Sequence, residues 1–134
     1  MRIEHIGIAV KDIDEAIKKF QVISPSMHIE YEKSKDGSMI IAFLDFDNIQ
    51  VELIQPLKKD SNVGKFIDKR GEGIHHLALE VPDILSSMDA AKENGIRLID
   101  QLPRKGSHGN MICFLHPKDF QGVLIEFCQP VQER

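Results

Sequence analysis

The chain has 134 residues, of which 42% are hydrophobic and 28% are charged, and its formal net charge at pH 7 is −4. This length is enough for a single domain with its own core, and no apolar run is long enough to cross a membrane. A net negative charge argues against general nucleic-acid binding, which requires a basic face. The N-terminal stretch lacks a secretory signal pattern, and Cys113 and Cys128 lie in apolar runs without CxxC spacing. We therefore expect a cytoplasmic protein with buried, reduced thiols.

The first half of the chain is predicted to form one strand, one helix and three further strands. Residues 3–10, IEHIGIAV, alternate and are rich in β-branched side chains, which is typical of a strand. Apolar residues at helical spacing predict a helix in residues 11–20, with Asp12 as its N-cap. The three further strands are expected at residues 28–32, 38–46 and 49–56.

The second half repeats this order after a connecting helix. That helix is expected in residues 60–73, with Ser61 as its cap and Gly71 at its end. A strand (74–81), a helix (82–95) and a strand (96–100) follow, and then a loop from Leu102 to Asn110. The last two strands are expected at 111–117 and 122–130.

The element order βαβββ therefore occurs twice, and the residues indicate a duplication. The stretch HIGIAVKDI at 5–13 matches HLALEVPDI at 76–84, and VELIQP at 51–56 matches IEFCQP at 125–130. Both matches are in the same order and at nearly the same separation. We predict an α+β fold made of two repeated βαβββ modules, in a single domain covering residues 1–134. Module 1 spans about 1–58, the linker helix about 60–71 and module 2 about 73–130.

The repeat pairs His5 with His76 rather than with the adjacent His75. Strand alternation gives a second reason for this choice, because neighbouring side chains point to opposite faces. His5 shares its face with Gly7 and Ala9, and His76 shares its face with Ala78. These small neighbours leave room for a site, whereas His75 is in phase with the aliphatic face and is expected to be structural.

Two carboxylates, Glu52 and Glu126, occupy equivalent positions between apolar neighbours in the repeat. A buried carboxylate requires a cation or a hydrogen-bonded partner. Two His and two Glu offer nitrogen and oxygen ligands to one divalent ion, and this donor set suits Co, Ni, Zn, Mn or Fe. We predict a metal site formed by His5, Glu52, His76 and Glu126. The alternative is a pair of buried His–Glu ion pairs without metal.

At this point the chain resembles the vicinal-oxygen-chelate superfamily over nearly its whole length, and within it the methylmalonyl-CoA epimerase family. The resemblance rests on HIGIAVKDIDEAI (5–17), VELIQPLKKDSNVGKFIDKRGEGIHHLALEV (51–81) and GSHGNMICFLHPKDFQGVLIEFCQ (106–129). It implies paired modules forming a barrel-like cleft that holds one metal. The family's metal ligands correspond to His5, Glu52, His76 and Glu126, the four residues predicted above.

The resemblance also implies epimerisation at C2 of methylmalonyl-CoA by proton abstraction through a metal-stabilised enolate. Glu126 is the candidate catalytic residue, as a ligand that also handles the proton. Arg104, Lys105 and Lys118 are candidates for contacting the phosphates of an acyl-CoA substrate. The family further implies a homodimer.

The chain departs from the family in two places. The family usually follows its first helix with an aromatic pair and an LG turn, whereas KFQVISPSMHIE here keeps only Phe20. At Glu52 the chain matches the family, although some epimerases carry Gln there. Some members place a second catalytic Glu on the strand after the first hairpin turn, where this chain has GSMIIAFL without an acid. The residue that acts on the opposite face of the substrate is therefore not assigned.

Three alternative functions remain open at this stage. A glyoxalase I type isomerase uses the same kind of metal-ligand set, and an extradiol dioxygenase uses two His and one Glu with Fe(II). A metal-free binding protein of the drug-sequestering type lacks such ligands.

Overall fold

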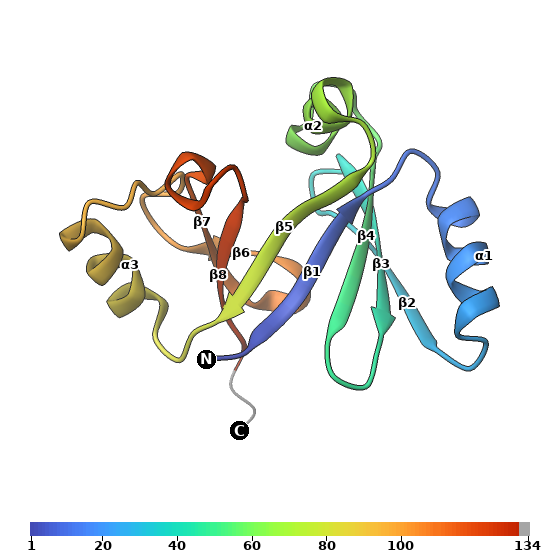
Figure 1. Ribbon diagram of the computed structural model, residues 1–134, viewed down its shortest axis with the longest axis horizontal. Helices are drawn as coiled ribbons and strands as arrows, with labels where there is room; N and C mark the ends of the chain where they lie inside the picture. Colours follow the sequence, from blue (N-terminus) through green and yellow to red (C-terminus); the bar gives the residue numbers. More distant parts are fainter. Residues whose placement is uncertain (132–134) are drawn as a thin grey trace. The chain divides into compact units, whose positions relative to one another are not determined.

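The computed structural model describes residues 1–131, and it confirms the predicted α+β class with a repeated βαβββ order (Figure 1). In chain order the helices and strands are β1 (Ile3–Ala9), α1 (Ile13–Ile23), β2 (His28–Lys33), β3 (Met39–Asp45), β4 (Gln50–Pro56), α2 (Asn62–Arg70), β5 (Gly73–Glu80), α3 (Ile84–Glu93), β6 (Arg104–Lys105), β7 (Met111–Leu115) and β8 (Ile125–Gln129). Two short 3-10 helices, Ser107–Gly109 and Pro117–Phe120, flank β7. No helix among the described residues is long and apolar enough to cross a membrane.

The chain divides into two compact units. The N-terminal unit is His5–His75, and the C-terminal unit consists of Met1–Glu4 with the residues from His76 onward. Strands follow the order β2-β3-β4-β1 in the first and β5-β8-β7-β6 in the second. In each unit one pair is parallel, β1 with β4 and β5 with β8, and the other pairs are antiparallel.

The first helix of each repeat begins in the same way. Asp12 accepts a hydrogen bond from the backbone N–H of Glu15, and Asp83 accepts one from that of Ser86, both at 3.2 Å. These bonds satisfy one of the backbone donors that a helix N-terminus leaves without an intrahelical partner. The predicted cap at Asp12 is confirmed.

Ser61 and Gly71 delimit α2 as predicted. The Ser61 side chain accepts a hydrogen bond from the Gly64 backbone N–H, and Gly71 has a φ of 76°, which a residue without a side chain adopts at low cost. The first turn of α2 lies against the preceding loop. A Cβ added to Gly64 would meet the backbone oxygens of Lys59 at 2.6 Å and Lys58 at 2.8 Å. Glycine is thus required by close approach at this position.

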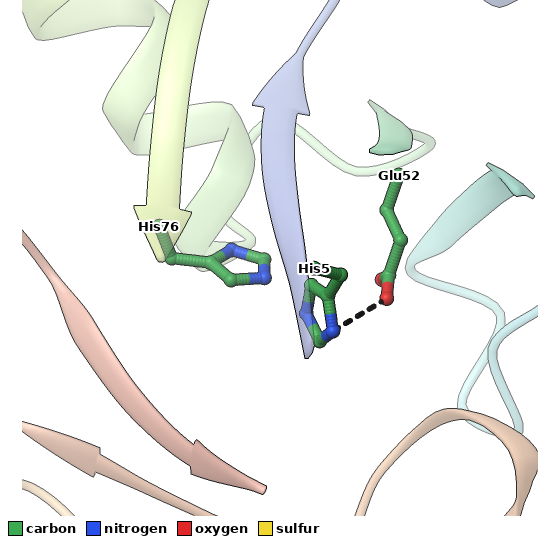
Figure 2. A group of neighbouring side chains, drawn as sticks. All are labelled: His5, Glu52 and His76. Atoms are coloured by element: carbon green, nitrogen blue, oxygen red, sulfur yellow. Dashed lines mark ion pairs between the residues drawn. The ribbon is translucent and has the colours of Figure 1, made fainter. Parts of the chain in front are cut away.

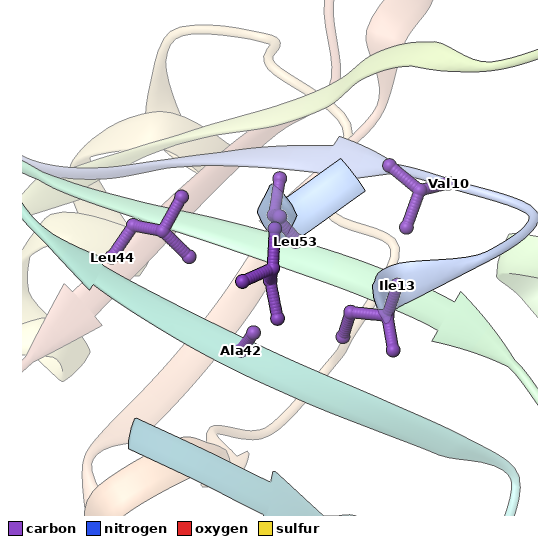
Figure 3. Close-up of a cluster of buried hydrophobic side chains, with 6 residues drawn as sticks. Val10, Ile13, Ala42, Leu44 and Leu53 are labelled. Atoms are coloured by element: carbon purple, nitrogen blue, oxygen red, sulfur yellow. The ribbon is translucent and has the colours of Figure 1, made fainter. Parts of the chain in front are cut away.

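Each unit contains a core between its sheet and its amphipathic helix. Figure 3 shows the core of the N-terminal unit, whose buried members are Val10, Ile13, Ile17, Ala42, Leu44 and Leu53. The core of the C-terminal unit contains, at the positions equivalent to the first five, Val81, Ile84, Met88, Cys113 and Leu115. The duplication therefore preserves these five core positions, although Met88 replaces Ile17 and Cys113 replaces Ala42.

The opposite face of the N-terminal sheet is covered by α2. Val63 of α2 is buried with Ile41, Phe43 and Ile54, and Phe66 packs beside them. The corresponding cluster of the C-terminal unit contains Ala78, Ile112 and Cys128, with Phe114 partly buried against it.

Two predictions between α3 and β7 were wrong. Residues 96–100 form only an isolated bridge, Leu98 with Leu115, and the segment expected to be loop contains β6. The backbone from Arg97 to Asp100 still lies along β7, since Ile99 N–H donates to the Phe114 carbonyl at 2.8 Å. The Asp100 side chain accepts from the Phe114 N–H, also at 2.8 Å, which takes the place of a ladder hydrogen bond.

Candidate metal and catalytic site

The four side chains predicted as metal ligands are all buried. His5, Glu52, His76 and Glu126 are between 3% and 5% exposed, and Ser38 is the one other buried polar residue in the described part of the chain. Placing imidazoles and carboxylates out of water is costly unless each has a polar or charged partner. The burial of these four side chains therefore indicates a polar site and not only hydrophobic packing.

In the N-terminal unit, His5 on β1 faces Glu52 on β4. Glu52 Oε2 lies 3.0 Å from His5 Nδ1, and the dashed line in Figure 2 marks this ion pair. The parallel register places Gly7, which has no side chain, opposite Glu52. On the other side of β4, Phe43 of β3 is its partner.

The C-terminal unit contains the equivalent pair. His76 on β5, also labelled in Figure 2, has its Nε2 atom 3.7 Å from Oε1 of Glu126 on β8. The parallel register places Ala78 opposite Glu126, and Phe114 of β7 is its antiparallel partner. This separation is within ion-pair range and is longer than in the first pair.

The registers of the two units agree position by position. Gly7 pairs with Glu52 as Ala78 pairs with Glu126, and each histidine precedes its small residue by two positions, on the same face of its strand. Phe43 and Phe114 are also equivalent. The sequence argument that selected His76 over His75 used this register, and the structure reproduces it.

Burial raises the pKa of Glu126 to about 8. The negative charges of Glu4 and Asp100 contribute to this rise, and the positive charge of Arg104 opposes it. In the absence of a bound cation, this carboxyl group therefore holds a proton through much of the neutral range. A cation at the site would favour the charged form, and a carboxyl group that titrates near neutrality is suited to proton transfer.

The remaining histidines have structural explanations. The ring of His75 packs edge to face on Phe66 at 5.0 Å, and burial lowers its pKa. His28 is exposed beside Glu30, and His116 Nδ1 accepts from the Lys118 N–H at the start of a 3-10 helix. His108 lies in the GSHG turn with a φ of 58°, in the left-handed region.

Sequence reasoning missed the role of the glutamine in each repeated QP pair. Gln55 Oε1 accepts a hydrogen bond from the Ile13 N–H, and Gln129 Oε1 accepts one from the Ile84 N–H, both at 2.8 Å. Each glutamine ties the end of the last strand to the first turn of the helix in the same unit. The repeated motif was the signal for this contact, but only the folded structure identifies the donor.

The family model of the glyoxalase/bleomycin resistance protein/dioxygenase superfamily matches residues 4–114. The chain belongs to this superfamily. It is 35% identical over 130 residues to an ethylmalonyl-CoA/methylmalonyl-CoA epimerase of Cereibacter sphaeroides, covering 96% of this chain and 97% of that protein.

Solved structures give the same relationship. A methylmalonyl-CoA epimerase from Mycobacterium tuberculosis is 36% identical, with a TM-score of 0.89 over 97% of this chain and 88% of its own. An epimerase of Streptomyces coelicolor in complex with 2-nitronate-propionyl-CoA is 33% identical, with a TM-score of 0.90 over 98% and 99% of the two chains. The predicted resemblance to this family is confirmed.

Proposed function

We propose that this protein is a metal-dependent epimerase that inverts C2 of methylmalonyl-CoA. The observation that carries the proposal is the pair of equivalent, buried His–carboxylate contacts, His5 with Glu52 and His76 with Glu126. The similarity to epimerases over nearly the whole chain supports the choice of reaction and of an acyl-CoA substrate.

The donor set fits a divalent metal. We propose that His5, Glu52, His76 and Glu126 hold one ion of Co, Ni, Zn, Mn or Fe, since two imidazoles and two carboxylates supply donors that these metals accept. Two carboxylates also balance the charge of the ion. When bound, such an ion acts as a Lewis acid that stabilises the negative charge developing on the thioester oxygen.

Glu126 is the proposed acid–base residue. The proton at C2 lies between a thioester and a carboxylate, and its removal requires a base in a setting that excludes water. Glu126 is 3% exposed, and burial raises its pKa to about 8. That value belongs to the metal-free protein, and a cation at the site favours the charged carboxylate, which is the form that accepts a proton from carbon.

The other expectations extend this proposal to partners and location. Lys105 and Lys118, together with Arg104, are exposed cations available to an acyl-CoA. A homodimer and a cytoplasmic location stay predictions.

Proton exchange in heavy water tests the reaction. Metal-loaded protein with methylmalonyl-CoA should introduce deuterium at C2 faster than the enzyme-free control, and chelation of the metal should remove the acceleration. A protein that leaves C2 unlabelled but isomerises a glutathione hemithioacetal would be a glyoxalase I type enzyme instead. Oxygen uptake with a catechol and Fe(II) would identify a dioxygenase.

The adjacent histidines provide a matched test of the ligand set. His76→Ala should abolish metal binding measured by titration and elemental analysis, whereas His75→Ala should retain it, because the His75 ring packs on α2. If the His75 variant is the one that loses metal, the assignment of ligands is wrong.

A further inference from the structure

Arg104 is fixed in place by two neighbours within the C-terminal unit. Its Nε donates to Oδ1 of Asp100 at 3.0 Å, and its guanidinium lies over the ring of Phe114, 5.4 Å from the ring centroid. Asp100 is itself held, since its second oxygen accepts from the Phe114 backbone N–H. Carboxylate, ring and guanidinium therefore orient one another.

This arrangement adjoins His76 and Glu126 in the same unit. The Phe114 ring meets the His76 imidazole edge to face, with centroids 5.7 Å apart and planes at 84°. Phe114 also pairs across the sheet with Glu126, and Arg104 is one of the charges that influence the pKa of that carboxyl group, which burial raises. Arg104 thus belongs to the surroundings of His76 and Glu126.

Stability does not account for such an arginine. Its side chain is 52% exposed, and ion pairs at this exposure contribute little to folding. Within residues 1–131, Arg104 forms an ion pair with Asp100 alone, through Nε, which leaves the two terminal amino groups of the guanidinium as donors. An oriented guanidinium with spare donors is suited to bidentate recognition of an anion.

We propose that Arg104 binds the free carboxylate of the substrate acyl group and thereby selects malonyl-type thioesters over simple acyl-CoAs. The inference rests on the proposed epimerase function. An acyl-CoA carries two kinds of anion, the acyl carboxylate and the phosphates of CoA. The carboxylate is attached to the reacting carbon, whereas the long pantetheine arm separates the phosphates from the thioester. Only the Phe114 ring separates the Arg104 guanidinium from His76 and Glu126. Arg104 is therefore positioned to bind the acyl carboxylate, which is the anion closer to the reacting carbon.

Two thioesters distinguish these anions, because propionyl-CoA lacks the carboxylate of methylmalonyl-CoA and shares its phosphates. Calorimetric titration of metal-loaded protein with racemic methylmalonyl-CoA avoids heat from net epimerisation. Arg104→Ala should weaken binding of methylmalonyl-CoA by about 10- to 100-fold, the usual effect of losing a hydrogen bond to a charged group. The affinity for propionyl-CoA should be unchanged, and Arg104→Lys should restore part of the loss.

Arg97 provides the matched control. It is an arginine of the same unit with similar exposure, paired with Asp119 at 2.9 Å, and Arg97→Ala should leave both affinities unchanged. Equal weakening of both thioesters by Arg104→Ala would assign Arg104 to the CoA phosphates and overturn the proposal, as would no change in either. If wild-type protein neither binds methylmalonyl-CoA nor exchanges its C2 proton, the proposed function fails, and this inference fails with it.

Discussion

The two units share one template, but they differ in what lies against the carboxylate. In the N-terminal unit, Phe43 is the partner of Glu52 and is buried with residues of α2. In the C-terminal unit, the equivalent Phe114 is only partly buried and carries the guanidinium of Arg104. Duplication has therefore preserved the histidine, the carboxylate and the opposing ring, while the covering of the ring has diverged.

We infer that Glu52 and Glu126 have diverged in function. Glu52 lies in a unit where a helix contributes apolar cover. Glu126 lies among charged neighbours, with Glu4, Asp100 and Arg104 all acting on its pKa after burial has raised it. Equivalent positions in a repeat thus do not imply equivalent chemistry.

The largest expected effect is on catalysis. Glu126→Gln should lower C2 exchange by about 10²- to 10⁴-fold, the usual contribution of a positioned acid–base group. Glu52→Gln should cost much less, because Gln keeps an oxygen ligand and removes no proposed base. Deuterium incorporation at C2, with the metal content of each variant measured in parallel, checks both values. Equal losses at equal metal content would show that the two carboxylates are functionally alike.

Equivalent substitutions in the two hydrophobic cores should cause similar losses of stability, unlike the substitutions of the two carboxylates. Leu44 and Leu115 are equivalent and fully buried. Replacing either with Ala should lower the free energy of unfolding by about 2–5 kcal/mol, the range for emptying a buried leucine site. Denaturant titration of the metal-free variants measures this. A large loss for one leucine and almost none for the other would contradict the equivalence of the two cores.

Much of the fold followed from the sequence because its signals are local. The alternation of residues 3–10, the caps at Asp12 and Ser61 and the glycine at 71 each act within a few residues of their position. The repeat added long-range information, since matching His5 with His76 fixed which strand face each histidine occupies. The two carboxylates were reached from their equivalent positions between apolar neighbours, and all four predicted ligands are buried.

What the sequence did not predict depends on contacts between distant residues. Asp100 accepts the Phe114 N–H, so the expected strand at 96–100 is reduced to one bridge. The orientation of Arg104 depends on that same aspartate and on a ring ten positions further along the chain. Neither contact has a periodicity that a single sequence reveals.

The next effect is the part of the pH dependence of folding stability that Glu126 contributes. The pKa of Glu126 in the folded, metal-free protein is about 8, above its ordinary value of 4.5. Between these two values the folded state binds more protons than the unfolded state, so stability falls as pH rises. The contribution is complete below about pH 4.5 and is lost above about pH 8. We expect a fall of about 2–4 kcal/mol across this window.

Chemical denaturation of metal-free protein at several pH values measures this slope, with Glu126→Gln as the matched variant. The glutamine cannot titrate, so this variant should lack that part of the slope. Asp119 does not contribute to the slope in this window, because its hydrogen bond from Arg97 lowers its pKa to about 2. Burial lowers the pKa of His75, so this histidine contributes a slope of opposite sign in the same window, but it does so in both proteins. The difference in stability between wild type and Glu126→Gln therefore isolates Glu126, and a difference that does not fall from pH 5 to pH 8 would contradict the assignment.

The smallest expected effect comes from the two glutamines, and it should be the same in both units. Gln55 and Gln129 each accept one backbone N–H at 2.8 Å, from Ile13 and Ile84 at the start of the helix. Gln→Ala leaves that part-buried donor without its protein acceptor, which should cost about 1 kcal/mol at either site. Because the two sites share no partner, the double variant should lose the sum of the two. Thermal or denaturant unfolding of the two single variants and the double variant measures this, with the exposed Gln101→Ala as a control of side-chain type. A double variant far less stable than the sum would mean that the two helix starts are coupled, and the units would then not be independent copies of one template.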